Sequence, residues 1–251
     1  MSNLTPINLE QLKVSCEDCK LRELCFPQGM STDDMQLLDK IVVQRQPLHK
    51  NESLYHDGDD AQAIYAVRSG SVKTSAESFN GDEQIVGFHL PGEIIGLDGF
   101  RDGHHSCTAV ALETSSICAI PMEQLEELCK SMPGLQKQMR RVMGKEISAE
   151  HAMLLMLGKM SAEERLATFL LSFSQRMEER HWKYNEFVLS MPRQDVANYL
   201  GLAVETVSRL FAHYQNAGII EVDRRRIGIL DVLRLRRMAG TVHAEKIAHA
   251  K

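Results

Sequence analysis

The chain has 251 residues, of which 43% are hydrophobic and 25% are charged, with a formal net charge of −5. These values are normal for a soluble globular protein, and six cysteines are too sparse for a disulfide framework. No apolar run reaches the length of a membrane span and nothing at the N-terminus reads as a secretory signal, so we expect a cytoplasmic protein without a membrane partner.

The charge is unevenly distributed along the chain. Residues 193–237 hold eight arginines and no lysine against five acidic residues, a net of +3, which leaves about −8 for the remainder. A basic C-terminal module on an acidic body is the distribution that contact with phosphates requires.

Three cysteines near the N-terminus, Cys16, Cys19 and Cys25, form a C-x2-C-x5-C run, and Cys118 follows much later. Such spacing lets a short loop wrap several thiolates around one inorganic centre, with the distant cysteine as a fourth ligand. The spacing predicts a metal site, and by itself it leaves zinc and an iron–sulfur cluster open.

A short amphipathic helix is predicted over residues 31–43, with Ser31 or Thr32 as its cap. Short β-rich runs then alternate with turn signals such as D-G-D, S-G-S, N-G-D and P-G-E up to about residue 121. We expect strands near residues 53–55, 63–68, 71–75, 84–89, 107–111 and 115–120. Many short strands at nearly regular spacing predict a β-sandwich or jelly-roll barrel. His104 and His105 are interpreted as part of a polar loop of this barrel.

A short helix is predicted over residues 122–132 and a long one over about 135–157. Apolar positions of the long helix alternate in steps of four and three, the heptad pattern of helices that pair in a dimer. The predicted seam consists of Met143, Ile147, Glu150, Leu154 and Leu157. Two interpretations of Glu150 are open: it lies slightly off the seam in solvent, or it faces its mate and weakens the dimer by like-charge repulsion.

A second module begins at Ser161, where S-A-E-E has the form of a capping box before a helix over 165–177. Two helices are predicted at 193–200 and 204–216, joined by a tight turn at Gly201 that needs a positive φ. A small β-wing should follow at 219–222 and 226–230. The pattern predicts a DNA-reading helix-turn-helix, and the alternative is an ordinary helical hairpin.

The second of these helices should place Val207, Leu210 and Phe211 inward and a polar face outward at its N-terminal end. The predicted DNA-contacting residues are Arg193, Val204, Glu205, Thr206, Ser208 and Arg209. Arg209 can bond two acceptors on a guanine and Glu205 can accept from a cytosine amino group. Arg193, with Arg224 and Arg225, is better placed for phosphates. No nucleophile–base pair stands out, so we do not expect an enzyme.

In this order of elements the chain resembles the CRP/FNR transcription regulators, and within them the FNR/Anr branch of oxygen-responsive regulators of anaerobic metabolism. The resemblance is carried by C-E-D-C-K-L-R-E-L-C, G-D-E-Q-I-V-G-F-H-L-P-G-E-I-I-G, A-L-E-T-S-S-I-C-A-I-P, A-E-E-R-L-A-T-F-L and Y-L-G-L-A-V-E-T-V-S-R-L-F. It implies an α+β fold with an N-terminal β-roll (double-stranded β-helix or jelly-roll) sensor domain, a long dimerisation helix and a C-terminal winged helix-turn-helix. The expected boundaries are a cysteine loop at 1–30, the β-roll at 31–132, the dimerisation helix at 133–160 and the DNA-binding domain at 161–251.

The resemblance also implies a cofactor and partners. A [4Fe-4S] cluster would be held by Cys16, Cys19, Cys25 and Cys118, while Cys107 and Cys129 would be structural or free thiols. With the cluster intact, a homodimer would bind a palindrome like TTGAT-N4-ATCAA, and oxygen would disassemble the cluster and inactivate the protein. The turn Phe79–Gln84 resembles the family loop that touches RNA polymerase, and the protein would act as an activator or repressor.

No cyclic nucleotide is expected. The positions that bind ribose and cyclic phosphate in cAMP-binding relatives correspond here to Leu97 and to His105-Ser106, where an apolar side chain and a largely neutral imidazole replace a glutamate and an arginine. Two rival interpretations stay open: a regulator of this fold with a structural zinc ion at the cysteines, and a regulator that senses a ligand in the barrel.

Overall fold

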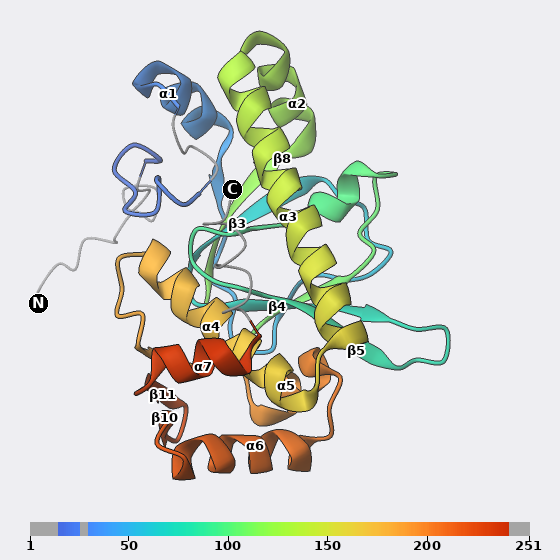
Figure 1. The fold of residues 1–251 in the computed structure, drawn as a ribbon. Coiled ribbons are helices and arrows are strands. Elements are labelled where there is room, and N and C mark those ends of the chain that lie inside the picture. The colour runs from blue at the N-terminus through green and yellow to red at the C-terminus, as the bar shows by residue number, and fades with distance from the viewer. Residues whose placement is uncertain (1–14, 26–29, 241–251) are drawn as a thin grey trace, which may run out of the picture. The chain divides into compact units, whose positions relative to one another are not determined.

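The structure is a computed structural model that describes residues 15–25 and 30–240, and these fold as two compact units. One unit contains the described residues as far as Val72 together with His89–Met143, and the other contains Lys73–Phe88 and the described residues from Gly144 onward. Helix α3 (Pro133–Lys159), the longest in Figure 1, contributes its first turns to one unit and the rest to the other. Within the described ranges no helix is both long and apolar enough to cross a membrane.

The first unit is built on antiparallel β-strands with helices at one side. One sheet has the strand order β1-β8-β3-β6, and β2 pairs with β7 in another sheet. The elements are α1 (Thr32–Ile41), β1 (Val43–Gln44), β2 (Ser53–Tyr55), β3 (Ala63–Ser69), β6 (Ile94–Ile95), the 3-10 helix η2 (Leu97–Phe100), β7 (Thr108–Ala111), β8 (Ser116–Pro121) and α2 (Met122–Ser131).

Strand β3 separates two hydrophobic cores because successive side chains of a strand point to opposite faces. Ile64 and Ala66 pack into a core that includes residues of α1, α2 and the start of α3. Tyr65 and Val67 pack into the other core, inside the β-roll. Strand β8 alternates in the same way, and its Cys118 packs against the first core. The alternation therefore places Cys118 on the side of α1 and the N-terminal loop.

The second unit combines a β-hairpin with a helical module. Its elements are most of β4 (Val72–Glu77), β5 (Glu83–His89), the rest of α3, α4 (Ala162–Glu179), β9 (Glu186–Val188), α5 (Arg193–Leu200), α6 (Val204–Asn216), β10 (Ile220–Asp223), β11 (Arg226–Ile229) and α7 (Val232–Met238). The predicted capping box at the start of α4 is present, because the Ser161 hydroxyl accepts from the Glu164 N–H and the Glu164 carboxylate accepts from the Ser161 N–H.

The predicted architecture is confirmed: antiparallel β-sheets come first, then a long helix, then a helix-turn-helix followed by a β-hairpin wing. The two helices predicted at 193–200 and 204–216 coincide with α5 and α6. The predicted strands are present with ends shifted by one or two residues. The sequence analysis did not anticipate β1, β6, β9 or α7, which are all short elements.

Candidate functional site

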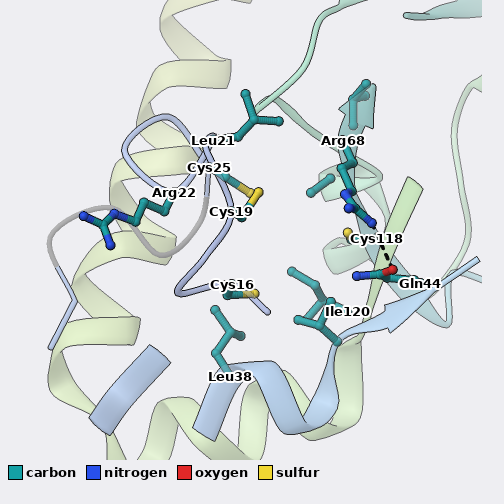
Figure 2. Close-up of a pocket in the computed structure, with 13 residues that line it drawn as sticks. Cys16, Cys19, Leu21, Arg22, Cys25, Leu38, Gln44, Arg68, Cys118 and Ile120 are labelled. Carbon is teal, nitrogen blue, oxygen red and sulfur yellow. Dashed lines mark hydrogen bonds between the residues drawn. The ribbon is translucent and has the colours of Figure 1, made fainter. Parts of the chain in front are cut away.

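The four cysteines of the predicted metal site line one pocket in the first unit. Cys16, Cys19 and Cys25 come from the N-terminal loop and Cys118 comes from β8. The pocket encloses about 550 Å³ of empty space, open solvent at its mouth included, and the remaining wall is largely aliphatic. Figure 2 shows the side chains of the loop on one side of this space and those of the sheet on the other. Cysteines far apart in the sequence therefore share one cavity.

The loop that carries three of these cysteines is closed by its own backbone. The N–H of Arg22 donates to the carbonyl of Cys19 at 3.1 Å, and the N–H of Cys25 donates to that of Leu21 at 2.8 Å. At its start the backbone N–H of Cys16 donates to Asp39 Oδ1 of α1 at 2.9 Å. Asp39 therefore anchors the first cysteine to α1, a contact that the sequence analysis did not identify.

The electrostatic surroundings keep Cys16 protonated in the metal-free protein. Burial, followed by the charge of the Asp39 carboxylate, raises the pKa of Cys16 to about 12. Metal binding would have to displace this proton, because the thiolate is the ligand form.

A cluster ligated by four cysteines fits the donors of this pocket. All six cysteines are thiols, and four of them line the same cavity. In the described ranges, however, no group of three or more His, Cys, Asp or Glu side chains is placed to hold a metal ion, so the four cysteines share a cavity without forming a preassembled site. Soft thiolate ligands favour zinc, copper(I) and iron–sulfur clusters over hard cations such as magnesium and calcium.

The second cysteine of the β-roll, Cys107, is in a different environment. Its sulfur lies 3.8 Å from the Tyr55 hydroxyl and 3.6 Å from Asp98 Oδ2. Burial, followed by the charge of Asp98, raises the pKa of Cys107 to about 12. Cys107 lies apart from the residues that line the four-cysteine pocket, and it provides a natural control for experiments on Cys118.

His105 lies in the predicted polar loop, but its side chain is buried. His105 is 2% exposed and stacks on Tyr55 with ring centroids 3.5 Å apart, while its Nδ1 lies 3.2 Å from Asp98 Oδ1. His104 is exposed, as expected. Asp98 lies seven residues before His105, and the polar contact with its carboxylate offsets part of the cost of burying the imidazole. The first unit therefore contains a His–Asp pair where cAMP-binding relatives are expected to have an arginine and a serine.

In the second unit α5 and α6 form the predicted helix-turn-helix. Gly201 ends α5 at φ +60°, and the N–H groups of Gly201 and Leu202 donate back to the last turn of that helix. On α6 the side chains of Val207 and Phe211 are buried and Leu210 is half-buried. Glu205, Ser208 and Arg209 are exposed, and Val204 and Thr206 are partly exposed. The structure therefore presents the predicted residues on the outer side of α6.

Arg193 is more enclosed than the sequence suggests. Its guanidinium lies over the Phe211 ring, 3.4 Å from the centroid, and burial lowers the pKa of Arg193 to about 10. Stacking on an aromatic face fixes the orientation of the planar guanidinium at the first turn of α5. Arg224 and Arg225 are exposed in the turn between β10 and β11.

The predicted dimer seam lies along α3. Ile147 and Leu154 are 53% and 70% exposed, Glu150 is exposed, and Met143 and Leu157 are half-buried. A leucine and an isoleucine with most of their surface in water on one helix stripe are suited to burial against another chain.

A set of polar contacts joins the β4–β5 hairpin to α5, and no sequence pattern indicated these contacts. The Asn198 carboxamide accepts from the Ile85 N–H at 2.6 Å and donates to the Glu83 carbonyl at 2.7 Å. Gln84 Nε2 donates to the Asn198 carbonyl at 2.8 Å, and Lys73 lies 3.3 Å from Asp195. The hairpin and the helix-turn-helix are thereby joined within one unit.

A β-roll followed by a long helix and a winged helix-turn-helix defines the class: this is a DNA-binding transcription regulator. Residues 45–132 match the family described as cyclic nucleotide-binding domain, and residues 164–238 match the Crp-like helix-turn-helix domain. The chain belongs to the CRP/FNR family of transcription regulators.

Similar proteins place it close to the FNR/Anr type. It is 47% identical to the transcriptional activator protein Anr of Pseudomonas protegens over 90% of this chain and 92% of that protein. It is 41% identical to the fumarate and nitrate reduction regulatory protein of Escherichia coli K12 over 94% and 93% of the two chains. The solved structure of FixK2 from Bradyrhizobium japonicum matches with a TM-score of 0.72 and 28% identity, covering 79% of this chain and 97% of that one. The first two of these relatives are named as a transcriptional activator and a regulatory protein, not as enzymes.

Proposed function

We propose that this protein is an oxygen-responsive regulator whose Cys16, Cys19, Cys25 and Cys118 hold a [4Fe-4S] cluster. The observation that carries the proposal is the single pocket lined by these four cysteines, in a chain nearly half identical to Anr. When bound, the cluster supplies a redox-active centre that oxygen can convert or destroy. The residues of the chain hold it, exclude water with the aliphatic wall, and tie the loop to β8.

A continuous hydrophobic core offers the route from this pocket to the dimer helix. Cys16, Cys25 and Cys118 pack against the core that contains Leu135 of α3. Met139 and Val142, further along the same helix, pack against that core as well. Because packed cores resist continuous deformation, tying the loop to β8 changes the support of the first turns of α3. This contact is the physical basis for coupling the cysteines to dimerisation.

The active form is a homodimer that pairs along Met143, Ile147, Glu150, Leu154 and Leu157. Burial of Ile147 and Leu154 drives pairing, and the Glu150 carboxylates oppose it when they face each other. Because these two contributions to the dimerisation free energy oppose each other, the stability of the dimer depends on how the first turns of α3 are packed.

The dimer presents two α6 helices to a palindrome like TTGAT-N4-ATCAA, one DNA turn apart. Val204, Glu205, Thr206, Ser208 and Arg209 read base edges, and Arg193 contacts phosphate. The fully exposed Phe79 at the tip of the β4–β5 hairpin marks the surface for RNA polymerase. The protein acts in the cytoplasm on genes of anaerobic metabolism, as activator or repressor, and without a cyclic nucleotide.

The test uses full-length protein purified without oxygen. Iron and sulfide content, visible absorption, oligomer mass and binding to the palindrome are measured before and after exposure to air. We expect a visible band that air bleaches, together with loss of the dimer and of DNA binding. Colourless protein that contains zinc and binds DNA equally in air would overturn the proposal.

Two matched variants assign the fourth ligand. Cys118→Ser should lose iron, sulfide and the visible band, while Cys107→Ser should keep all three. The reverse outcome would place the fourth ligand on Cys107. Retention of oxygen-dependent DNA binding by Cys19→Ser and Cys118→Ser would favour a ligand sensed in the barrel.

A further inference from the structure

The sheet side of the cysteine pocket carries a cation next to Cys118. In the register of the sheet Cys118 is opposite Gln44 of β1 and opposite Ala66 of β3. Directly opposed residues of neighbouring strands share a face, and so do residues two apart on one strand. Gln44 and Ala66 are therefore on the same face as Cys118. The register of β3 shifts between Val67 and Ser69, so Arg68 is placed by the pocket itself, which Arg68 lines together with Gln44 and Ala66.

Arg68 is fixed by its neighbour rather than extended into water. One guanidinium N–H donates to Gln44 Oε1 at 2.9 Å, and the side chain is half-buried. Figure 2 shows this hydrogen bond beside Cys118, with the guanidinium directed along the sheet wall of the pocket. A guanidinium has five N–H donors in a rigid plane. Within residues 15–25 and 30–240 only the bond to Gln44 occupies them, so the others are available at the pocket.

A cation at this position would stabilise a cluster in the pocket. Four thiolates bring more negative charge than the iron–sulfur core neutralises, and the wall formed by Leu38, Val42 and Ile120 offers no compensation. Net charge and hydrogen bonds to the sulfurs are among the factors that set the reduction potential of iron–sulfur centres. A permanent positive charge disfavours removal of an electron and so raises that potential.

We propose that Arg68, positioned by Gln44, is the residue that partly neutralises the four-cysteine cluster and sets how readily oxygen oxidises it. The inference rests on the proposed function, since it requires a cluster at these cysteines. In the oxidation concerned, dissolved oxygen is the oxidant, accepts one electron from the cluster and becomes superoxide. Arg68 is a positioning and tuning residue, not a ligand.

A second arginine provides a matched control. Arg22 also lines the pocket, but its NH1 donates to the Glu17 carbonyl at 3.2 Å and its Nε lies 3.3 Å from the Glu23 carboxylate. Figure 2 shows its guanidinium directed away from the sulfurs. Removing the charge of Arg22 should therefore leave the cluster unaffected.

The experiment compares Arg68→Gln, Arg68→Lys and Arg22→Gln with the unaltered protein, all purified without oxygen. The measurements are iron and sulfide content, the midpoint potential from a redox titration followed by visible absorption, and the bleaching rate in air. Arg68→Gln should lower the midpoint potential and bleach about tenfold faster, the lower end of effects seen for residues around metal ligands. Arg68→Lys should be intermediate and Arg22→Gln unchanged.

The outcomes separate the two proposals. An unaltered protein without iron and sulfide overturns the proposed function and this inference together. A normal cluster whose potential and bleaching rate do not change in Arg68→Gln overturns only the inference. If Arg68→Gln takes up no cluster, Gln44→Leu decides, because it keeps the charge and frees the guanidinium: faster bleaching supports the inference, and an unchanged rate overturns it.

Discussion

Replacing Asn198 by alanine should loosen the β4–β5 hairpin from α5. The substitution removes the bonds to the Ile85 N–H and to the Glu83 carbonyl. Glu83 is exposed, so its carbonyl can bind water and that loss costs about 1 kcal/mol. Ile85 is 1% exposed, so its N–H stays unsatisfied at a cost of about 1–3 kcal/mol.

Alanine has the higher helix propensity, which returns about 0.6 kcal/mol within α5. The net cost of opening this joint is therefore about 2 kcal/mol. That figure corresponds to roughly thirtyfold faster opening, since each 1.4 kcal/mol is a factor of ten. Hydrogen exchange of the Ile85 amide, followed by mass spectrometry of peptides from β5, measures this opening directly.

Two further variants make the measurement specific. Asn216→Ala, at the exposed end of α6, carries the same chemical change away from the hairpin and should leave exchange in β5 unchanged. Asn198→Asp keeps the acceptor for the Ile85 N–H but turns an oxygen toward the Glu83 carbonyl. Its exchange rate in β5 should lie between those of Asn198→Ala and the unaltered protein. Equal exchange in Asn198→Ala and the unaltered protein would refute the reasoning.

Three other predictions concern DNA reading, the dimer and the turn of the helix-turn-helix. Arg209→Ala should weaken palindrome binding by about 1–3 kcal/mol and relax the preference at one base pair; in competition binding, an equal loss on all sequences would instead assign Arg209 to phosphate. Glu150→Gln should raise the dimer fraction in air about fivefold, because it removes roughly 1 kcal/mol of repulsion between the two carboxylates. An unchanged dimer dissociation constant in sedimentation would place Glu150 off the seam. Gly201→Ala should lower the free energy of unfolding by about 1–2 kcal/mol because of the positive φ at this position. In thermal unfolding the loss should exceed that of Gly218→Ala. A Cβ at Gly201 meets Leu157 Cδ2 at 3.2 Å, whereas a Cβ at Gly218 meets nothing within 4 Å. Equal destabilisation of the two glycine variants would show that the contact with Leu157 is unimportant.

The helical module was predictable because its signals are local. Gly201 requires a left-handed conformation, the Ser161–Glu164 pair is a capping box, and both are written within a few residues. The co-location of four cysteines was also predictable, through their spacing and the family resemblance.

The residues that surround these cysteines could not be predicted from the sequence. Asp39 and Arg68 reach the pocket through helix packing and strand register, which depend on partners far along the chain. The role of Asn198 could not be predicted either. Its carboxamide bonds to the backbone of another segment, and backbone groups carry no sequence signal. The burial of His105 was not predicted because it depends on Tyr55 and Asp98, and no local sequence pattern indicates a histidine stacked on a tyrosine beside a carboxylate.

The hydrogen bonds of Asn198 also cover part of the edge of a β-sheet. Strand β5 is the last strand of its sheet, and open backbone groups on an edge strand are a template for pairing with another chain. The Asn198 carboxamide fills the donor and acceptor positions that a further strand would occupy at Glu83 and Ile85. A fragment that ends after α3 would lack Asn198 and leave this edge uncovered, so we expect the fragment to self-associate through β5.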